Sequence, residues 1–149
     1  RGERRIAAAD FFDGVLSTTL EPDEILTEIV VPKPPAGSGA AFVEISRRLG
    51  DFALAGVAAQ ITFDGNTVTD VRLAACGVGA GPVRLTNAEA AIRDGGLTED
   101  ALPRAASAAS GEVDPDGDVH ATAAYRRKLA GVMTKRALVK AADRAGVSL

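Results

Sequence analysis

The sequence is poor in the residues that most often bind nucleic acid or carry chemistry. Its 149 residues contain one cysteine, one histidine and one methionine, and aromatic side chains make up only 4%. The formal net charge of −3 leaves no excess of basic residues. Nucleic-acid binding usually depends on basic surfaces and stacking rings, so we set nucleic acid aside as a partner.

Long apolar runs are also missing. No stretch approaches the roughly 20 apolar residues that span a bilayer, so we expect no membrane insertion. The single cysteine, Cys76, cannot form a disulfide within the chain, which agrees with a reducing, cytoplasmic environment. Because Cys76 lies in an apolar segment, we interpret it as a small buried hydrophobe.

Three short motifs resemble known sites but lack a required residue. "GVGAGP" at 77–82 has Pro82 where a dinucleotide fingerprint needs its third glycine. "DPDGD" at 114–118 begins like a calcium loop, but its glycine stands in the fourth position, where the loop needs it in the sixth. His120 has neither a partner ligand for a metal nor a nucleophile elbow for a triad. We interpret them as a turn, a solvated loop with Asp118 as a candidate helix N-cap, and a surface helix residue.

Proline and glycine divide the chain near residue 35. Residues 25–31 ("ILTEIVV") alternate in a way that predicts a strand with one mostly apolar face, stopped by Pro32. "KPPAGSG" at 33–39 has the composition of a linker. We therefore expect a boundary between residues 1–32 and residues 40–149.

Alternation with period two begins at Ala40 and predicts three antiparallel strands, at 40–46, 52–63 and 68–79. The Asp-Gly pair in "FDGNTV" is a hairpin signal between the last two. Small residues dominate the central strand, which we expect to be buried on both faces under a closely packed element. In the third strand, the inward side chains are expected to be Val71, Leu73 and Ala75.

Helical patterns follow to the end of the chain. The first, 85–96, has Thr86 and Glu89 in the positions of a capping box, and the second, 98–111, has Thr98 as N-cap. The third, 118–146, is long enough for about six turns and places an apolar stripe on one side, formed by Tyr125, Leu129, Val132, Met133 and Val139. Strands followed by helices predict an α+β fold, with a small antiparallel three-stranded sheet covered on one face by about three helices.

Two charged corners remain, "SRRLGDFA" at 46–53 and "YRRK" at 125–128. Their arginines are Arg47, Arg48, Arg126 and Arg127, and Asp51 is a local partner. They are either ordinary surface charges or a surface that faces an anion or another subunit, since the arginine fork suits phosphates and carboxylates. Composition and spacing leave both interpretations open.

Four motifs in order resemble the C-terminal half of the FAD-binding medium subunit of molybdenum hydroxylases, the carbon monoxide dehydrogenase and xanthine dehydrogenase family. The resemblance covers nearly the whole chain. It implies that residues 1–32 are a C-terminal remnant of the FAD-binding domain, 33–39 a linker, and 40–149 the C-terminal α+β domain of the flavoprotein subunit. The motifs are "ADFFDGVLSTTLEPDEILTEIVVP", "FVEISRRLGDFALAGVAAQIT", "VRLAACGVGAGPVRLTNAEAAI" and "YRRKLAGVMTKRAL".

The resemblance implies an electron-transfer role in an oxidoreductase complex. In such enzymes a molybdenum cofactor in a large subunit oxidises the substrate, electrons pass through [2Fe-2S] clusters in a small iron-sulfur subunit, and FAD in the medium subunit delivers them to an acceptor. Leu26 matches a position that contacts the flavin. Arg47, Arg48, Asp51 and Phe52 match a loop against the isoalloxazine, where a cation favours the anionic reduced ring.

The chain departs from the family pattern in two ways. The glycine-rich loops that hold the FAD phosphates are not in it, and Val43 and Glu44 occupy the neighbourhood where a lysine is often found. Because the chain starts at Arg1 and its only methionine is Met133, we expect upstream residues to be missing. We therefore expect this chain alone to bind FAD weakly or not at all and to be inactive. The alternative is a non-catalytic interaction or dimerisation domain without flavin.

Overall fold

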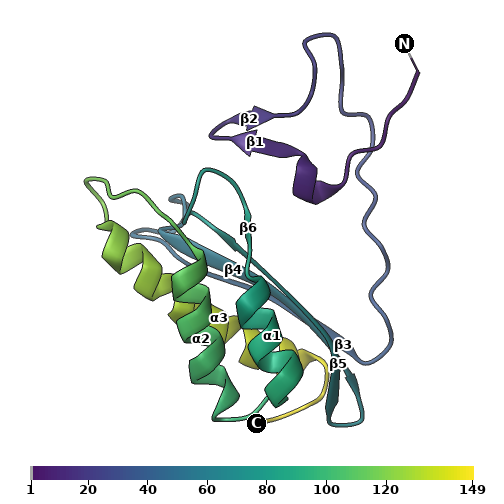
Figure 1. The fold of residues 1–149 in the computed structure, drawn as a ribbon, viewed down its shortest axis with the longest axis vertical. Helices are drawn as coiled ribbons and strands as arrows, with labels where there is room; N and C mark the ends of the chain where they lie inside the picture. The colour runs from purple at the N-terminus through teal and green to yellow at the C-terminus, as the bar shows by residue number, and fades with distance from the viewer. Residues whose placement is uncertain (1) are drawn as a thin grey trace. The chain divides into compact units, whose positions relative to one another are not determined.

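The computed structural model describes residues 2–149 (Figure 1), and they fall into two compact units that meet between Lys33 and Pro34. The first unit contains the 3₁₀ helix η1 (Ala8–Asp10) and a hairpin of β1 (Phe12–Gly14) and β2 (Ser17–Thr18). Residues 25–31 form neither helix nor strand, so the strand predicted there is wrong. No strand of the described residues pairs with this segment, and a strand alone leaves its backbone groups without partners.

An ion pair joins the two ends of the first unit. The Arg4 guanidinium donates to both carboxylate oxygens of Glu24 at 2.6 Å and to the Thr19 carbonyl at 2.7 Å. The Glu21 amide also donates to the Glu24 carboxylate, at 2.8 Å. These bonds, above all the one from Arg4, lower the pKa of Glu24 to about 2.

The second unit is built on an antiparallel sheet in the order β3-β4-β5-β6. Its long strands are β3 (Ser38–Ile45), β4 (Ala55–Asp64) and β5 (Thr67–Cys76), which confirms the three predicted strands. The two-residue β6 (Val83–Arg84) adds a short fourth strand that the sequence did not predict. The hairpin between β4 and β5 is also confirmed, and Gly65 turns it with φ of +58°.

Three helices cover one face of this sheet (Figure 1): α1 (Thr86–Gly95), α2 (Ala101–Glu112) and α3 (Ala123–Arg144). The helix α3 packs across β3 and β4, α1 packs on β5, and α2 packs against α1 and α3. The predicted α+β fold with its helices on one face is therefore confirmed. Among the helices of residues 2–149, none is long and apolar enough to cross a membrane.

The helix starts only partly match their predicted caps. The prediction of a capping box formed by Thr86 and Glu89 is wrong. The Glu89 carboxylate is buried, and it accepts hydrogen bonds from the Leu73 amide at 2.7 Å and from Arg84. The first amides of α1 donate instead to Glu112, at the end of α2. The N-cap of α2 is Asp100 and not the predicted Thr98, although the Thr98 hydroxyl accepts from the Ala101 amide at 3.1 Å.

The long helix α3 is as predicted in length but not in its buried stripe. Its 22 residues make about six turns, and Thr122 caps it by accepting from the Tyr125 amide at 3.2 Å, so the candidate cap Asp118 is wrong. Tyr125 is 44% exposed and Val132 37% exposed. Leu129 and Met133 are buried as predicted. The buried side of the helix also includes Leu138 and several small residues, among them Ala130, Ala137, Ala141 and Ala142.

Small residues let α3 approach the sheet closely. A Cβ at Gly39 on β3 would lie 1.9 Å from the Ala141 carbonyl oxygen and 2.6 Å from the Ala145 nitrogen. Close packing against a strand is therefore present, but its tightest point lies on β3 and not on the central strand, where it was expected. The expectation that β4 is buried on both faces is wrong, since Ala58 is exposed on the face opposite the helices.

Replacing Gly39 by alanine should destabilise the chain, because the added methyl group meets the backbone of α3, which cannot move aside as a side chain can. The expected loss is about 1 to 3 kcal/mol of unfolding free energy, the usual range for an overpacked core, measured by urea denaturation. Gly111→Ala is the matched control: Gly111 has open space around its Cβ position in α2, and alanine favours a helix by up to about 1 kcal/mol. Equal effects of the two substitutions would contradict the close packing.

The Glu24 carboxyl should titrate with a pKa of about 2, below its ordinary 4.5. Because folding depresses this pKa, the stability that the ion pair contributes is complete above the unfolded-state pKa of ~4.3 and is lost as the pH falls through the folded value. A carbon NMR titration of the side-chain carboxyl measures it. Arg4→Gln should return the pKa of Glu24 toward its ordinary value, and an unsubstituted chain that already titrates there would refute the ion pair.

Candidate functional site

The predicted corner is a tight loop, residues 46–54, that joins β3 to β4. We call it the β3–β4 loop. Its turn is closed by a hydrogen bond from the Asp51 amide to the Arg48 carbonyl at 3.2 Å, and Gly50 takes a φ of +89°. The Leu54 amide donates to the Ile45 carbonyl at 2.8 Å. A glycine therefore reverses the chain between two strands whose ends are bonded to each other.

The loop carries several chemically different groups, most of them exposed to solvent. The Phe52 and Leu49 side chains are both fully exposed to solvent. The Arg47 guanidinium lies 3.8 Å from the Asp51 carboxylate, with about half of the arginine side chain exposed. The same carboxylate oxygen, Oδ2 of Asp51, makes no hydrogen bond within the described residues. A ring, two guanidiniums and an incompletely satisfied carboxylate thus share one short loop.

The five predicted site residues divide between the two units. Arg47, Arg48, Asp51 and Phe52 lie together on the β3–β4 loop. Leu26 lies in the first unit, in the segment without regular structure, and its side chain is 48% exposed.

The paired arginines of α3 have opposite roles. Arg126 is buried: its Nη1 donates to the Leu54 carbonyl at 2.8 Å and to the Gly77 carbonyl at 3.1 Å, and its Nη2 donates to Asp118 at 2.7 Å. Arg127 is half-exposed and pairs with Asp114 at 2.5 Å. Interpreting Arg126 as a surface charge is therefore wrong, whereas Arg127 fits that interpretation.

Asp118 organises the loop before α3. Its Oδ1 accepts from the His120 and Ala121 amides at 2.8 and 2.9 Å, and these bonds lower the pKa of Asp118. Arg126 and Arg127 pair with two carboxylates of this loop, those of Asp118 and Asp114. Within residues 2–149 no group of three potential ligands could hold a metal ion. His120 is exposed as predicted but precedes α3, so it is not a helix residue.

Two other residues near the end of β5 match their interpretations in part. Gly77 has a φ of +73°, and a Cβ there would lie 2.7 Å from the Ala53 carbonyl oxygen, so the predicted close backbone approach is present. Cys76 is only half-buried; burial, followed by the charge of Glu44, raises the pKa of its thiol. Sequence reasoning did not connect Arg126 to Gly77 or to the β3–β4 loop, because no local pattern signals bonds to residues 49 and 72 positions away.

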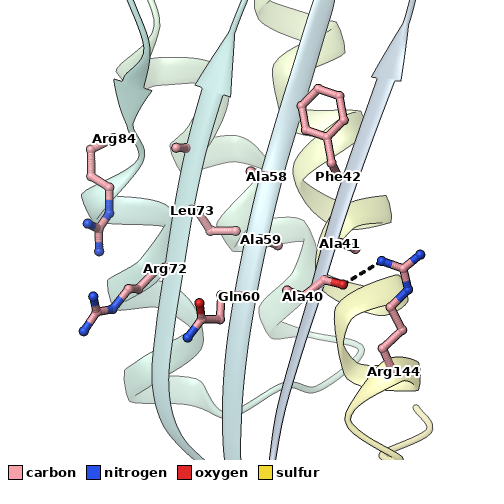
Figure 2. Close-up of a pocket in the computed structure, with 11 residues that line it drawn as sticks. Ala40, Ala41, Phe42, Ala58, Ala59, Gln60, Arg72, Leu73, Arg84 and Arg144 are labelled. Atoms are coloured by element: carbon pink, nitrogen blue, oxygen red, sulfur yellow. Dashed lines mark hydrogen bonds between the residues drawn. The ribbon is translucent and has the colours of Figure 1, made fainter. Parts of the chain in front are cut away.

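A concave surface lies on the face of the sheet opposite the helices (Figure 2). It has a volume of about 480 Å³, a floor of small residues such as Ala40, Ala58 and Ala74, and Phe42 at its edge. Figure 2 shows Arg72 and Arg84 on one side and Arg144 on the other, where Arg144 donates to the Ala40 carbonyl at 2.7 Å. The predicted site residues are not among the residues that line it.

Known proteins resemble this chain over nearly its whole length. It is 35% identical over 144 residues to the carbon monoxide dehydrogenase medium chain of Afipia carboxidovorans, covering 97% of this chain and 50% of that protein. It is 38% identical over 145 residues to the caffeine dehydrogenase subunit beta of a Pseudomonas species, covering 97% and 49%. The chain therefore spans about half the length of the curated relatives it matches.

The fold leads to the same group. Reconstituted carbon monoxide dehydrogenase from Oligotropha carboxidovorans contains a chain that matches with a TM-score of 0.89 and 34% identity, over 95% of this chain and 49% of that one. Quinoline 2-oxidoreductase from Pseudomonas putida 86 matches with a TM-score of 0.87 and 30% identity, over 95% and 49%. The family model described as the CO dehydrogenase flavoprotein C-terminal domain matches residues 40–141. These matches confirm the resemblance inferred from the sequence, and the chain belongs to the CO dehydrogenase flavoprotein C-terminal domain family.

Proposed function

We propose that this chain is part of the flavoprotein subunit of a cytoplasmic molybdenum-containing hydroxylase or dehydrogenase. It helps to position FAD and to dock other subunits, so that electrons pass from [2Fe-2S] clusters through FAD to an acceptor. The observation that carries the proposal is the β3–β4 loop. In a member of this family, it exposes Phe52 completely beside Arg47, Arg48 and Asp51.

Each group on the loop has a chemical use beside a flavin. The Phe52 ring supplies a flat apolar surface for an aromatic ring system. The Arg47 and Arg48 guanidiniums supply positive charge, which favours the anionic reduced ring. Asp51 orients Arg47 across 3.8 Å. Leu26, half-exposed in the first unit, is proposed to contribute an apolar contact to the same cofactor.

The described residues fit the ring of FAD better than its phosphates. A helix N-terminus with free amides is the usual phosphate site. In α1, the Asn87 and Ala88 amides already donate to the Glu112 carboxylate, at 2.8 and 3.0 Å, so this terminus is not free for an anion. The phosphates are therefore proposed to bind to glycine-rich loops outside this chain, and this chain alone should bind FAD weakly.

The domain arrangement follows from the same proposal. Residues 1–32 are proposed to be the end of the FAD-binding domain, 33–39 a linker and 40–149 the C-terminal domain, although β3 already begins at Ser38. The exposure of Ile25, Ile29 and Val31, between 76% and 84%, supports the need for further polypeptide beside this segment. The small iron-sulfur subunit and the large molybdenum-binding subunit are the proposed partners.

The proposal is tested most directly by purifying the native complex that contains this chain. A flavin and iron-sulfur absorption spectrum, together with two further subunits, is the expected result. A colourless protein without partners would favour a non-catalytic interaction domain instead.

Phe52→Ala in the complete subunit should weaken FAD binding about 2- to 10-fold, as removal of one aromatic stacking contact of ~0.5 to 1.5 kcal/mol implies. Its stability should not change, because the Phe52 ring is fully exposed. Flavin affinity is measured by fluorescence titration of the apoprotein, and stability by thermal unfolding without flavin. Val119→Ala, at a residue 94% exposed on another loop, is the matched control. Equal flavin affinities of the two variants would remove Phe52 from the site.

A further inference from the structure

The β3–β4 loop has few bonds of its own to hold it in place. Two hydrogen bonds form between residues of the loop. The Asp51 amide and the Ser46 hydroxyl both donate to the Arg48 carbonyl. The Arg47 side chain is exposed and lies 3.8 Å from the Asp51 carboxylate, so this ion pair adds little to hold the loop in position. Its last residue, Leu54, is by contrast buried and bonded through both backbone groups, the amide to Ile45 and the carbonyl to Arg126.

We propose that Arg126 is a positioning residue for the flavin-facing side chains of the β3–β4 loop, which it holds through the Leu54 carbonyl. The inference rests on the proposed function of that loop. Arg126 does not face the loop's exposed side, and its role is to fix the backbone two residues after Phe52.

The geometry shows how one side chain can do this. Nη1 of Arg126 donates to two carbonyls at once, Leu54 just before the start of β4 and Gly77 just after the end of β5. Nη2 donates to Asp118, whose other oxygen is held by the His120 and Ala121 amides. The guanidinium therefore ties the end of the loop to the neighbouring strand, to α3 and to the segment before α3.

Gly77 also helps to position the end of the β3–β4 loop, because it has no side chain. Its φ of +73° is one that side chains rarely adopt, and an added Cβ would lie 2.7 Å from the Ala53 carbonyl oxygen, the residue between Phe52 and Leu54. The absence of a side chain at Gly77 lets the two backbones lie close enough for Arg126 to bridge them. A substitution at Gly77 should thus displace the loop without touching Arg126.

Lysine cannot replace Arg126 in this role. An ammonium is a compact charge, whereas the planar guanidinium presents several fixed donors to carbonyls and carboxylates in different directions. Arg126→Lys keeps the charge opposite Asp118 and tests the fork alone. Arg127→Lys is the matched control, since Arg127 follows directly in α3 and pairs with the exposed Asp114.

The experiment uses the complete flavoprotein subunit in its complex and three readouts. Arg126→Lys should speed hydrogen exchange of the Leu54 amide, change the visible circular dichroism of the bound flavin, and slow flavin reoxidation by an artificial acceptor about tenfold, since a misplacement of ~1 Å can cost up to 100-fold. Arg127→Lys should leave all three unchanged. A role in stability alone would lower the unfolding temperature without altering the flavin spectrum of the folded complex.

The outcomes separate this inference from the proposed function. If Phe52→Ala alters the flavin and Arg126→Lys does not, the positioning role is overturned and the flavin site stands. If Arg126→Lys speeds exchange at Leu54 but neither variant alters the flavin, the proposed function fails, and the inference fails with it. Should Arg126→Lys not assemble, Gly77→Ala provides the same test, with Gly65→Ala at the distant hairpin as control for backbone strain. An unaltered flavin spectrum in Gly77→Ala would then overturn the inference.

Discussion

The seating of α3 on β3 and β4 is the constraint on which the second unit depends. At one end of the helix, the Ala141 carbonyl lies so close to Gly39 that no side chain fits between them. Near the other end, the Arg126 guanidinium bonds to backbone carbonyls next to β4 and β5. The helix is thus held by close van der Waals contact at one end and by directional hydrogen bonds at the other, and the end of the β3–β4 loop takes its position from the second.

Buried charge in this unit is compensated by several partners at once. Arg126 bonds to two carbonyls and to Asp118, and Glu89 to the Leu73 amide and Arg84. A buried charge without such partners would cost several kcal/mol. The loop's own ion pair, Arg47 with Asp51, is by contrast partly exposed, with 3.8 Å between nitrogen and oxygen, and surface pairs contribute about 0 to 1 kcal/mol to stability. The exposed groups of the loop are therefore available to a ligand at little cost to the stability of the fold. The buried Arg126 holds the end of the loop in place.

Local patterns sufficed for elements whose contacts are local. The alternation in β5 predicted that Val71, Leu73 and Ala75 point inward, because a strand with one covered face has a period of two. The same reasoning failed at residues 25–31, where the alternation is present but no neighbouring strand is available in the described chain. It also failed for β4, because a run of small apolar residues does not reveal whether one face or both will be covered.

The sequence by itself determined the strands and helices of the second unit, their α+β order, and the placement of two arginines and an aspartate on a glycine-reversed loop. Only the tertiary structure decided that Arg126 is buried and Arg127 exposed, that Glu112 caps α1, and that Glu89 faces the sheet. Their partners lie between 5 and 72 residues away. Such pairings arise when packed elements bring distant groups together, and no local sequence pattern predicts them.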